Sequence, residues 1–376
     1  MPAALARLRD PHAGTDIVHL NHAGFAPMCR AARDAGVEVL DRMTLGSAGD
    51  RDLIPLYERA RASYARLVGC GAEDVSFFQT AAAAISQVAL GLPLEPGDEI
   101  VRLDQEYPSN AYPWHRAAER AGARVIVVPS SPRLTASVEQ LIEAVTPRTR
   151  VLTVSSVQFQ TGLALDLPPI VAACHAVGAV VCVDAIQSLG VCAFDMCRLG
   201  VDYVCGGTHK WVLGPLGHGF LCCDADRRER LMPLLHGAIT YGLPGDPVEV
   251  TRPARAGAQR FEPGTPLVVG AVAGAAAIDE LLAVGIDRVH AAAIALADRV
   301  VSGARARGWD VLSGTAGTAR SPIVTFVPHG DVAALARRLA EARVSVAERA
   351  GGLRVSPHVD NGPQHVDRLF EVLDGG

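Results

Sequence analysis

The sequence predicts an α/β fold: a large domain with a mainly parallel sheet covered by helices, then a smaller C-terminal α+β domain. Three observations support this. Short β-rich apolar runs alternate with helix-like segments in the middle of the chain, the connections between them are short, and a long alanine-rich stretch precedes the C-terminal part. Strand-helix-strand alternation favours a parallel sheet with both faces covered. A chain of 376 residues can bury one large core, or one large and one small.

The central strands are predicted from four apolar runs, VIVVP, VLTVSS, AVVCVDA and VDYVCGG, at 125–129, 151–156, 179–185 and 201–207. The segment 168–178 between two of them is predicted to be helical, with Gly178 as its C-cap. Ligands of parallel sheets bind beyond the carboxyl ends of the strands. The residues that follow each run are therefore the candidates for a functional site.

The C-terminal third begins with VVGAVAGAAAIDELLAVG, which is typical of a helix that connects two domains. Beyond it, PIVTFVP and LRVSP are strand candidates, while DVAALARRLAEARV and HVDRLFEVL are helix candidates. We therefore expect an N-terminal arm (1–20), a large domain (21–265), a connecting helix (266–284) and a small domain (285–376). The Gly/Pro-rich stretch 237–259 is predicted to be a long active-site loop, since long loops in compact domains are usually functional.

Composition argues against several classes of partner. The net charge of −5, the absence of a basic run and an aromatic content of 5% disfavour nucleic acid. No apolar stretch is long enough to span a bilayer, and the N-terminus lacks the apolar region of a signal peptide. The nine cysteines are scattered, with no CxxC spacing or Cys/His cluster. We expect reduced core thiols, no metal site and a cytoplasmic location.

Lysine usage is the most unusual feature of the composition. Lys and Arg together number 35, and Lys210 is the only lysine. Arginine can replace lysine as a surface cation, but it cannot supply a primary amine that loses its proton. A lysine that survived by chance is the simpler explanation, so its surroundings must decide.

Three strand ends carry groups that can act together. Thr80 precedes a helix start of small residues, where free backbone N–H groups can hold a phosphate. Asp184 follows a buried run, with Gln187 one helical turn later. Lys210 follows another run, beside Trp211 and an apolar segment. Taken singly, Thr80 and Asp184 could be helix N-caps, and Lys210 could lie in a surface turn.

Together these groups match the needs of pyridoxal phosphate (PLP): an amine for the aldehyde, a carboxylate for the ring nitrogen and a cradle for the phosphate. The pKa of a free lysine is about 10.4. Burial at a strand end lowers it toward the free amine that Schiff-base formation requires. The sequence therefore predicts a Schiff base between Lys210 and PLP.

Six segments, in order along nearly the whole chain, resemble the class V aminotransferase family of fold-type I PLP enzymes, which includes cysteine desulfurases and isopenicillin N epimerase-like proteins. The segments are LNHAGFAP (20–27), EYPSNAYPW (106–114), VDAIQSLG around Asp184, GGTHKWVLGPLGHGF around Lys210, RFEPGTP (260–266) and LRVSPHVDN (353–361).

The resemblance implies a role for each matching residue. Lys210 would hold the cofactor and move the α-proton, Asp184 would keep the ring nitrogen protonated, and Tyr107 would stack on the ring. The phosphate would be held by the segment Thr80-Ala81-Ala82, by Thr208 and His209, and by Thr265 of a second subunit, so the resemblance implies a homodimer with shared active sites. The remaining expected contacts are Gln187 with the ring oxygen, Ser156 near the cofactor, and His22, Ala23, Asn110 and Arg354 with an amino-acid substrate. Arg354 would clamp the carboxylate, although a surface salt bridge is its alternative.

Three departures from the family pattern are visible. Gly207 stands where the family often has Ser, so either Thr208 supplies the hydroxyl or the phosphate is held more weakly. Ser156 stands where relatives often carry Asn or His. Cysteine desulfurases carry a nucleophilic Cys before the C-terminal Arg motif, whereas the segment ERAGGLRVSP (348–357) has none. Persulfide formation is therefore disfavoured.

The reaction type remains open among three possibilities. We favour β-elimination (C–S lyase chemistry) on an S-substituted cysteine or its sulfoxide, which needs only Lys210 as a base. Transamination would need a second half-reaction. Epimerisation would need a proton donor on the opposite ring face, for which Tyr107, His22 or a partner-subunit residue is a candidate. A PLP-binding regulatory protein is the non-enzyme alternative, although such a protein would need neither Arg354 nor the segment 20–27.

Overall fold

The computed structural model describes residues 8, 16–131, 133–242, 250–314 and 320–375, with the backbone alone described for 47–52. Most of the predicted N-terminal arm and the centre of the predicted loop 237–259 therefore lie outside the described residues. Within that loop segment, two short helical pieces flank the gap: α10 (Ala238–Tyr241) and the 3-10 helix η3 (Ala258–Phe261).

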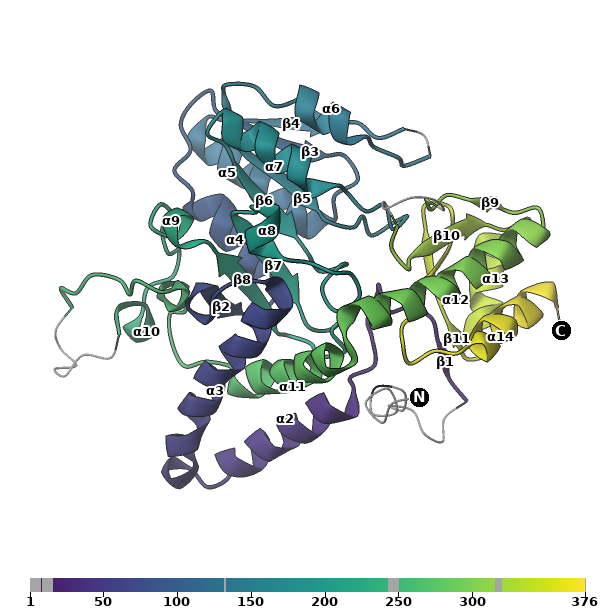
Figure 1. Cartoon of the computed structure of the whole chain (residues 1–376), viewed down its shortest axis with the longest axis horizontal. Coiled ribbons are helices and arrows are strands. Elements are labelled where there is room, and N and C mark those ends of the chain that lie inside the picture. Colours follow the sequence, from purple (N-terminus) through teal and green to yellow (C-terminus); the bar gives the residue numbers. More distant parts are fainter. Residues whose placement is uncertain (1–7, 9–15, 132, 243–249, 315–319, 376) are drawn as a thin grey trace.

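The predicted α/β fold is confirmed. A seven-stranded sheet has the order β2-β8-β7-β6-β5-β3-β4, and β8 is its one antiparallel member (Figure 1). The strands are β2 (Val75–Phe78), β3 (Glu99–Leu103), β4 (Arg124–Val128), β5 (Thr149–Ser155), β6 (Val180–Asp184), β7 (Tyr203–Gly207) and β8 (Gly219–Cys223). Because β2, β3, β5, β6 and β7 run the same way, their carboxyl ends meet at one edge of the sheet.

Both faces of this sheet are buried because successive side chains point to opposite sides. Val180 and Cys182 of β6 pack in one core with α4 (Ala81–Gly91) and α5 (Tyr112–Ala121). Val181 and Val183 pack in the other, with α7 (Leu167–Ala176), α3 (Ser47–Val68) and α11 (Val268–Val284). The strands are apolar at nearly every position for this reason, so they read as continuous runs.

Helices not singled out from the sequence surround this frame: α2 (Arg30–Met43), which packs with α3 and α11, then α6 (Val138–Glu143), α8 (Met196–Leu199) and α9 (Ala225–Arg228). Among the described residues, no single helix has the length and apolar composition to cross a membrane. The pair formed by α11 and α12 (Ile286–Ala306), bent by 82°, passes that test only jointly. The apolar side chains of both helices contribute to the protein core.

The C-terminal part forms a separate sheet with the order β12-β13-β10-β9, all antiparallel, which α12 reaches in Figure 1. Its elements are β9 (Asp310–Val311), β10 (Val324–Val327), α13 (Val332–Glu341), β12 (Ala347–Arg349), β13 (Gly352–Val355) and α14 (Pro363–Asp374). A two-stranded parallel pair joins β1 (Val18–His19) to β11 (Val344–Ser345), so the N-terminal segment lies against this part. The boundaries at 20, 265 and 284 stay predictions.

Candidate active site

Lys210 lies just beyond the carboxyl end of β7 and is partly buried. Burial lowers the pKa of its amine to about 8, the charge of Asp184 opposes this shift, and the charges of Arg354 and Arg349 add to it. The amine lies 5.7 Å from the centre of the Tyr107 ring, over its face. The predicted drop in the pKa of Lys210 is thus confirmed, and its cause is removal of the amine from water.

Asp184 ends β6, the strand next to β7, and is 3% exposed. Its Oδ1 accepts one hydrogen bond, from the backbone N–H of Ile186 at 3.0 Å. Burial raises the pKa of the carboxyl to about 6, the Ile186 N–H and the charge of Lys210 oppose the rise, and Glu106 adds to it. The residues after Asp184 form a turn and not a helix, so Asp184 is not an N-cap. The turn engages one carboxylate oxygen and leaves the other for a ring nitrogen.

The helix α4 presents the candidate phosphate cradle. Thr80 is its N-cap, and the Thr80 Oγ1 accepts from the Ala83 N–H at 3.0 Å. The first amides, those of Ala81 and Ala82, have no acceptor inside the helix. Gly219 of β8 packs so close that a Cβ there would lie 2.3 Å from the Thr80 carbonyl carbon. Only glycine fits this position, and it brings β8 directly under the helix start.

Thr208 and His209 follow β7 on the same side. The Thr208 hydroxyl donates to the Pro215 carbonyl at 2.7 Å, within its own turn, so its one proton is already in use. Burial and the charge of Lys210 lower the pKa of His209 to about 4, so this ring is neutral at physiological pH. Of the two possibilities raised by Gly207, this geometry favours a weaker phosphate grip.

Gln187 is buried behind the site with its amide fully oriented. Its Oε1 accepts from the Trp211 indole at 2.7 Å, and its Nε2 donates to the Ala23 carbonyl at 3.0 Å. An amide nitrogen has two hydrogens, so one N–H remains for a ring oxygen. Through this hydrogen bond, the backbone of Ala23 contacts the residue that is expected to bind the ring oxygen.

Arg354 of β13 is 1% exposed. Its guanidinium donates to the Phe159 carbonyl at 2.7 Å and to Asn21 Oδ1 at 3.2 Å, and its Nε has no hydrogen-bond partner within the described residues. Burial and the charge of Arg349 lower its pKa to about 10. Tyr107 packs edge-on against Phe159, with ring centres 5.1 Å apart. This buried group with unused donors suits a carboxylate, and the structure does not favour the surface salt bridge.

Three of the expected residues have side chains that are engaged elsewhere, and a fourth is exposed. His22 is fully buried, with both ring nitrogens engaged by Ser356 and Asp360. Asn110 is also fully buried, and it bonds to Glu106, Trp114 and Thr153. The Ser156 hydroxyl faces Ser188 at 2.7 Å. Thr265 is exposed, at the rim of a cavity of about 520 Å³ that Gln79 and Ala83 also line. Direct substrate contact by His22 or Asn110 would need these bonds to break.

Glu106 is a residue that the sequence reasoning missed. It directly precedes Tyr107, and its buried carboxylate accepts from Ser155 N–H and Oγ, Gln158 and Asn110 at 2.6–2.8 Å. Burial raises its pKa although these donors oppose the rise. The available signal in the sequence was an acidic residue shortly after Leu103, where β3 ends, and directly before Tyr107. Within the described residues no group of three or more His, Cys, Asp or Glu side chains could hold a metal.

Comparison with known proteins agrees with this arrangement. A probable cysteine desulfurase of Methanothermobacter thermautotrophicus is 33% identical over 233 residues, which cover 62% of this chain and 57% of that protein. The isopenicillin N epimerase of Streptomyces clavuligerus is 31% identical over 393 residues, covering 95% of this chain and 94% of the epimerase. A solved cystine C–S lyase, in complex with cysteine persulfide, superposes with a TM-score of 0.91 at 22% identity, over 97% of this chain and 99% of the lyase.

The family model described as aminotransferase class-V matches residues 47–364. This range includes the candidate cradle at α4, Asp184, Lys210 and Arg354. The chain therefore belongs to the class-V aminotransferase family of PLP-dependent enzymes.

Proposed function

We propose that this protein is a PLP-dependent lyase that removes the sulfur substituent from an S-substituted cysteine or its sulfoxide. Water is consumed, and the products are pyruvate, ammonia and a thiol, or a sulfenic acid from a sulfoxide. The observation that carries the choice is the tight turn between β12 and β13. Only Ala350 and Gly351 separate these strands, both at positive φ, so the turn has neither a thiol nor the length to deliver one.

The residues described fit PLP. Lys210 offers a partly buried amine with a lowered pKa, Asp184 a buried carboxylate on the adjacent strand, and α4 its unpaired first amides. Gln187 retains one N–H, and Tyr107 lies beside the Lys210 amine. When bound, PLP supplies a ring that accepts the electrons released when a bond at Cα breaks.

The side chains around the site have distinct tasks in this proposal. Arg354 binds the substrate carboxylate through its unused N–H groups and so fixes which bond at Cα faces Lys210. The Lys210 amine takes the α-proton, and its burial, which lowers the pKa to about 8, leaves part of the amine unprotonated and able to accept that proton. The C–S bond then breaks, and the sulfur leaves with the bonding pair and is protonated.

Sulfur transfer to an enzyme thiol is less well supported. The nine cysteines are free, and none lies in the C-terminal part of the chain. Burial raises the pKa of Cys205, which is paired with Asp184 across the sheet, so this thiol is a poor nucleophile. The named relatives include probable cysteine desulfurases, and the solved C–S lyase is a fold neighbour, so both kinds of chemistry occur on this frame.

Epimerisation is the second candidate, because the alignment with isopenicillin N epimerase extends over 94% of that enzyme. It requires a proton donor facing Lys210. His22 is poorly suited, since both its nitrogens are engaged, and Tyr107 is the better candidate.

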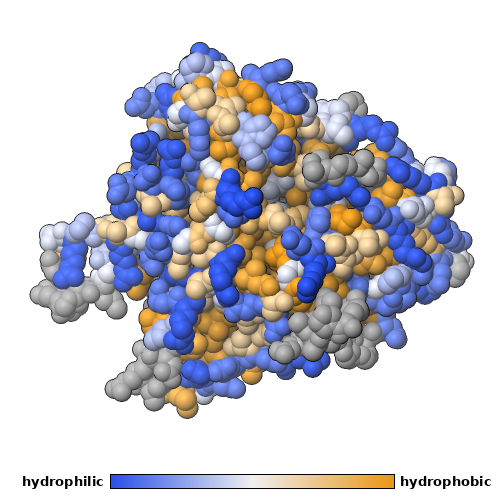
Figure 2. Space-filling model, viewed as in Figure 1, coloured by the Kyte–Doolittle hydropathy of each residue, from blue (hydrophilic) through white to orange (hydrophobic). Residues whose placement is uncertain are grey.

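We further propose a homodimer located in the cytoplasm. Exposed apolar side chains at i, i+3 and i+6 on α2 (Val37, Leu40 and Met43) form a stripe that a second subunit would cover. Figure 2 shows hydrophobic residues in the lower part of the molecule, where α2 and α3 lie in Figure 1. Thr265 is exposed and free to reach a partner's site. Size-exclusion chromatography with light scattering tests the dimer.

One experiment separates the reactions. Purified protein with PLP is incubated in deuterated water with cysteine conjugates, their sulfoxides and ordinary amino acids. Pyruvate and a released thiol in equal amounts support the lyase. Inverted, deuterated substrate without pyruvate would establish epimerisation instead, and accumulation of the amine form of the cofactor would establish transamination. PLP binding with none of these changes would support the non-enzyme alternative.

A further inference from the structure

Three segments distant in sequence meet directly behind Lys210: residues 20–23, Trp211 and residues 356–360. We propose that the buried hydrogen bond between His22 and Asp360 positions both the substrate clamp Arg354 and the cofactor contact Gln187. The inference rests on the proposed PLP enzyme, whatever its reaction, and assigns His22 and Asp360 as positioning residues.

The proton positions follow from the partners of the His22 ring. Its Nδ1 lies 3.1 Å from the Ser356 carbonyl oxygen, which can only accept, so Nδ1 carries a hydrogen. Its Nε2 lies 3.1 and 3.2 Å from the two oxygens of Asp360. Burial opposes ionisation of Asp360, but the charge and hydrogen bond of His22, with His358 and His19, lower its pKa to about 2. Both ring nitrogens of His22 therefore lie within hydrogen-bond distance of an oxygen, and this fixes the orientation of the ring.

His358 completes the cluster as a neutral ring. Its Nε2 donates to the Trp211 carbonyl at 3.1 Å. Burial and the charge of His22 lower the pKa of His358 to about 3. The His22 ring lies 5.2 Å from His358 and 6.2 Å from Trp211, stacked on the indole. The His22 ring is therefore enclosed by one carboxylate and three flat rings, the third being His19 at 4.8 Å, and the peptide after Lys210 is held from the same side.

The neighbours of His22 carry this geometry to the site. Asn21 accepts from Arg354 at 3.2 Å. Ala23 donates its N–H to Ser356 Oγ at 3.0 Å and accepts from Gln187 through its carbonyl. Since His22 lies between them, a shift of its ring moves the acceptor of Arg354 and the acceptor of Gln187 together. A displacement of about 1 Å at such contacts can cost roughly 100-fold in rate.

The test compares Asp360→Asn with Asp367→Asn, whose carboxylate pairs with Arg299 on the surface. Both variants are loaded with PLP, and the change in visible absorbance gives apparent dissociation constants for L-alanine and for methylamine. Methylamine has no carboxylate and does not use Arg354. We expect Asp360→Asn to weaken alanine binding about tenfold or more, to leave methylamine within about twofold and to shift the absorbance band, while Asp367→Asn matches wild type.

The inference is overturned if Asp360→Asn matches Asp367→Asn, or if it weakens both ligands equally, as general loosening would. Should Asp360→Asn not fold, Trp211→Phe removes the indole donor to Gln187 together with part of the ring that stacks on His22, and it must still shift the absorbance band. Nitrogen NMR of His22 decides independently of PLP: its ring resonances must move in Asp360→Asn and stay in place in Asp367→Asn. Ring resonances that do not move in Asp360→Asn refute the His22–Asp360 contact, whereas a wild-type protein that binds no PLP refutes the proposed function.

Discussion

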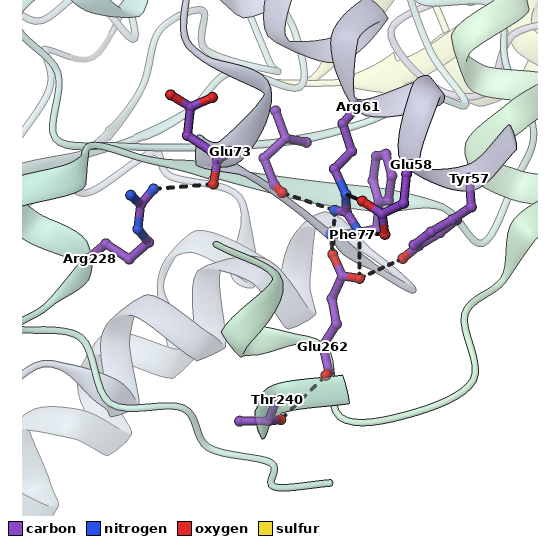
Figure 3. A network of polar contacts seen from close by, with 9 residues as sticks. Tyr57, Glu58, Arg61, Glu73, Phe77, Arg228, Thr240 and Glu262 are labelled. Carbon is purple, nitrogen blue, oxygen red and sulfur yellow. Dashed lines mark hydrogen bonds and ion pairs between the residues drawn. The ribbon is translucent and has the colours of Figure 1, made fainter. Parts of the chain in front are cut away.

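Two fully buried arginines show how this molecule treats charge. Arg61 and Arg354 are each 1% exposed. Arg61 donates to Glu262, Glu58 and the Val75 carbonyl, and Glu262 also accepts from Tyr57 and from the Phe77 N–H (Figure 3). Within the part of the chain that the structure describes, Arg354 has two acceptors, neither of them a carboxylate, and its Nε has no partner.

The pKa shifts of the two arginines run in opposite directions because their partners differ. Burial opposes the charge of both arginines, but Glu262 and Glu58 more than offset it and raise the pKa of Arg61. No carboxylate of the described residues lies beside Arg354, and burial lowers its pKa to about 10. Arg61 is a saturated charge, meaning that carboxylates accept from its guanidinium, and it joins α3, β2 and the segment before Thr265. Arg354 is an unsaturated charge, meaning that donors are left over, and such a group is suited to bind a ligand.

Replacing Lys210 should have the largest effect. Because no other lysine exists, Lys210→Ala removes the only side-chain amine that can anchor PLP. We expect the visible band of the bound cofactor and all turnover to disappear, while the melting temperature of the cofactor-free protein stays unchanged or rises. Absorbance and calorimetry measure both. A visible band that survives in this variant would refute the site.

Glu262→Gln should break the ion pair of the saturated charge Arg61. Removal of one partner from a buried ion pair costs about 3–5 kcal/mol of unfolding free energy. Chemical denaturation measures this, with Asp279→Asn at the exposed pair with Arg66 as the control, expected within about 0.5 kcal/mol of wild type. If both variants lose the same free energy of unfolding, burial does not make the Arg61–Glu262 pair more important for stability than the exposed pair.

Asp184→Asn should affect turnover rather than folding. Loss of a buried charge that pairs with a bound group costs about 2–5 kcal/mol, a roughly 30- to 5000-fold slower reaction. Since burial already raises the pKa of Asp184 to about 6, the cofactor-free variant should be as stable as wild type at pH 7 or more so. Normal turnover in this variant would contradict a role at the ring nitrogen.

Arg354→Lys tests the unsaturated charge. A lost hydrogen bond to a charged group costs about 1.5–3 kcal/mol, so the apparent KM should rise about 10- to 150-fold, with kcat less affected. Arg61→Lys is the matched substitution, and it should lower stability while KM stays near the wild-type value. The comparison fails if both substitutions act mainly on stability.

The smallest effect concerns pH. The free amine is the form that reacts, and the pKa of Lys210 is lowered from 10.5 to about 8. The rate at which PLP enters cofactor-free protein should rise about tenfold per pH unit below 8 and level off above it. Stopped-flow absorbance between pH 6 and 10 checks this. A rise that continues toward pH 10 would mean that Lys210 is solvated like a free lysine.

Sequence patterns were sufficient for the strands and for the strand-end residues. Fully apolar runs such as the one that ends at Asp184 occur because both faces are buried, and parallel strands bring Asp184 and Lys210 to one edge. The orientation of individual side chains was not predictable. His22 turns toward Asp360, which lies 338 residues away, and Asn110 turns toward Thr153. Contacts of this kind depend on the packed tertiary structure, and no local pattern encodes them.

The lone lysine also defines how this protein can be modified chemically. Its surface cations are arginines, which do not react with acylating reagents, and its one side-chain amine is partly buried behind Tyr107. Apart from a terminal amine, a reductive reagent that fixes an aldehyde to lysine can mark only one residue. The protein is therefore a natural single-site scaffold, in which any label carried on a lysine side chain reports on the candidate site alone.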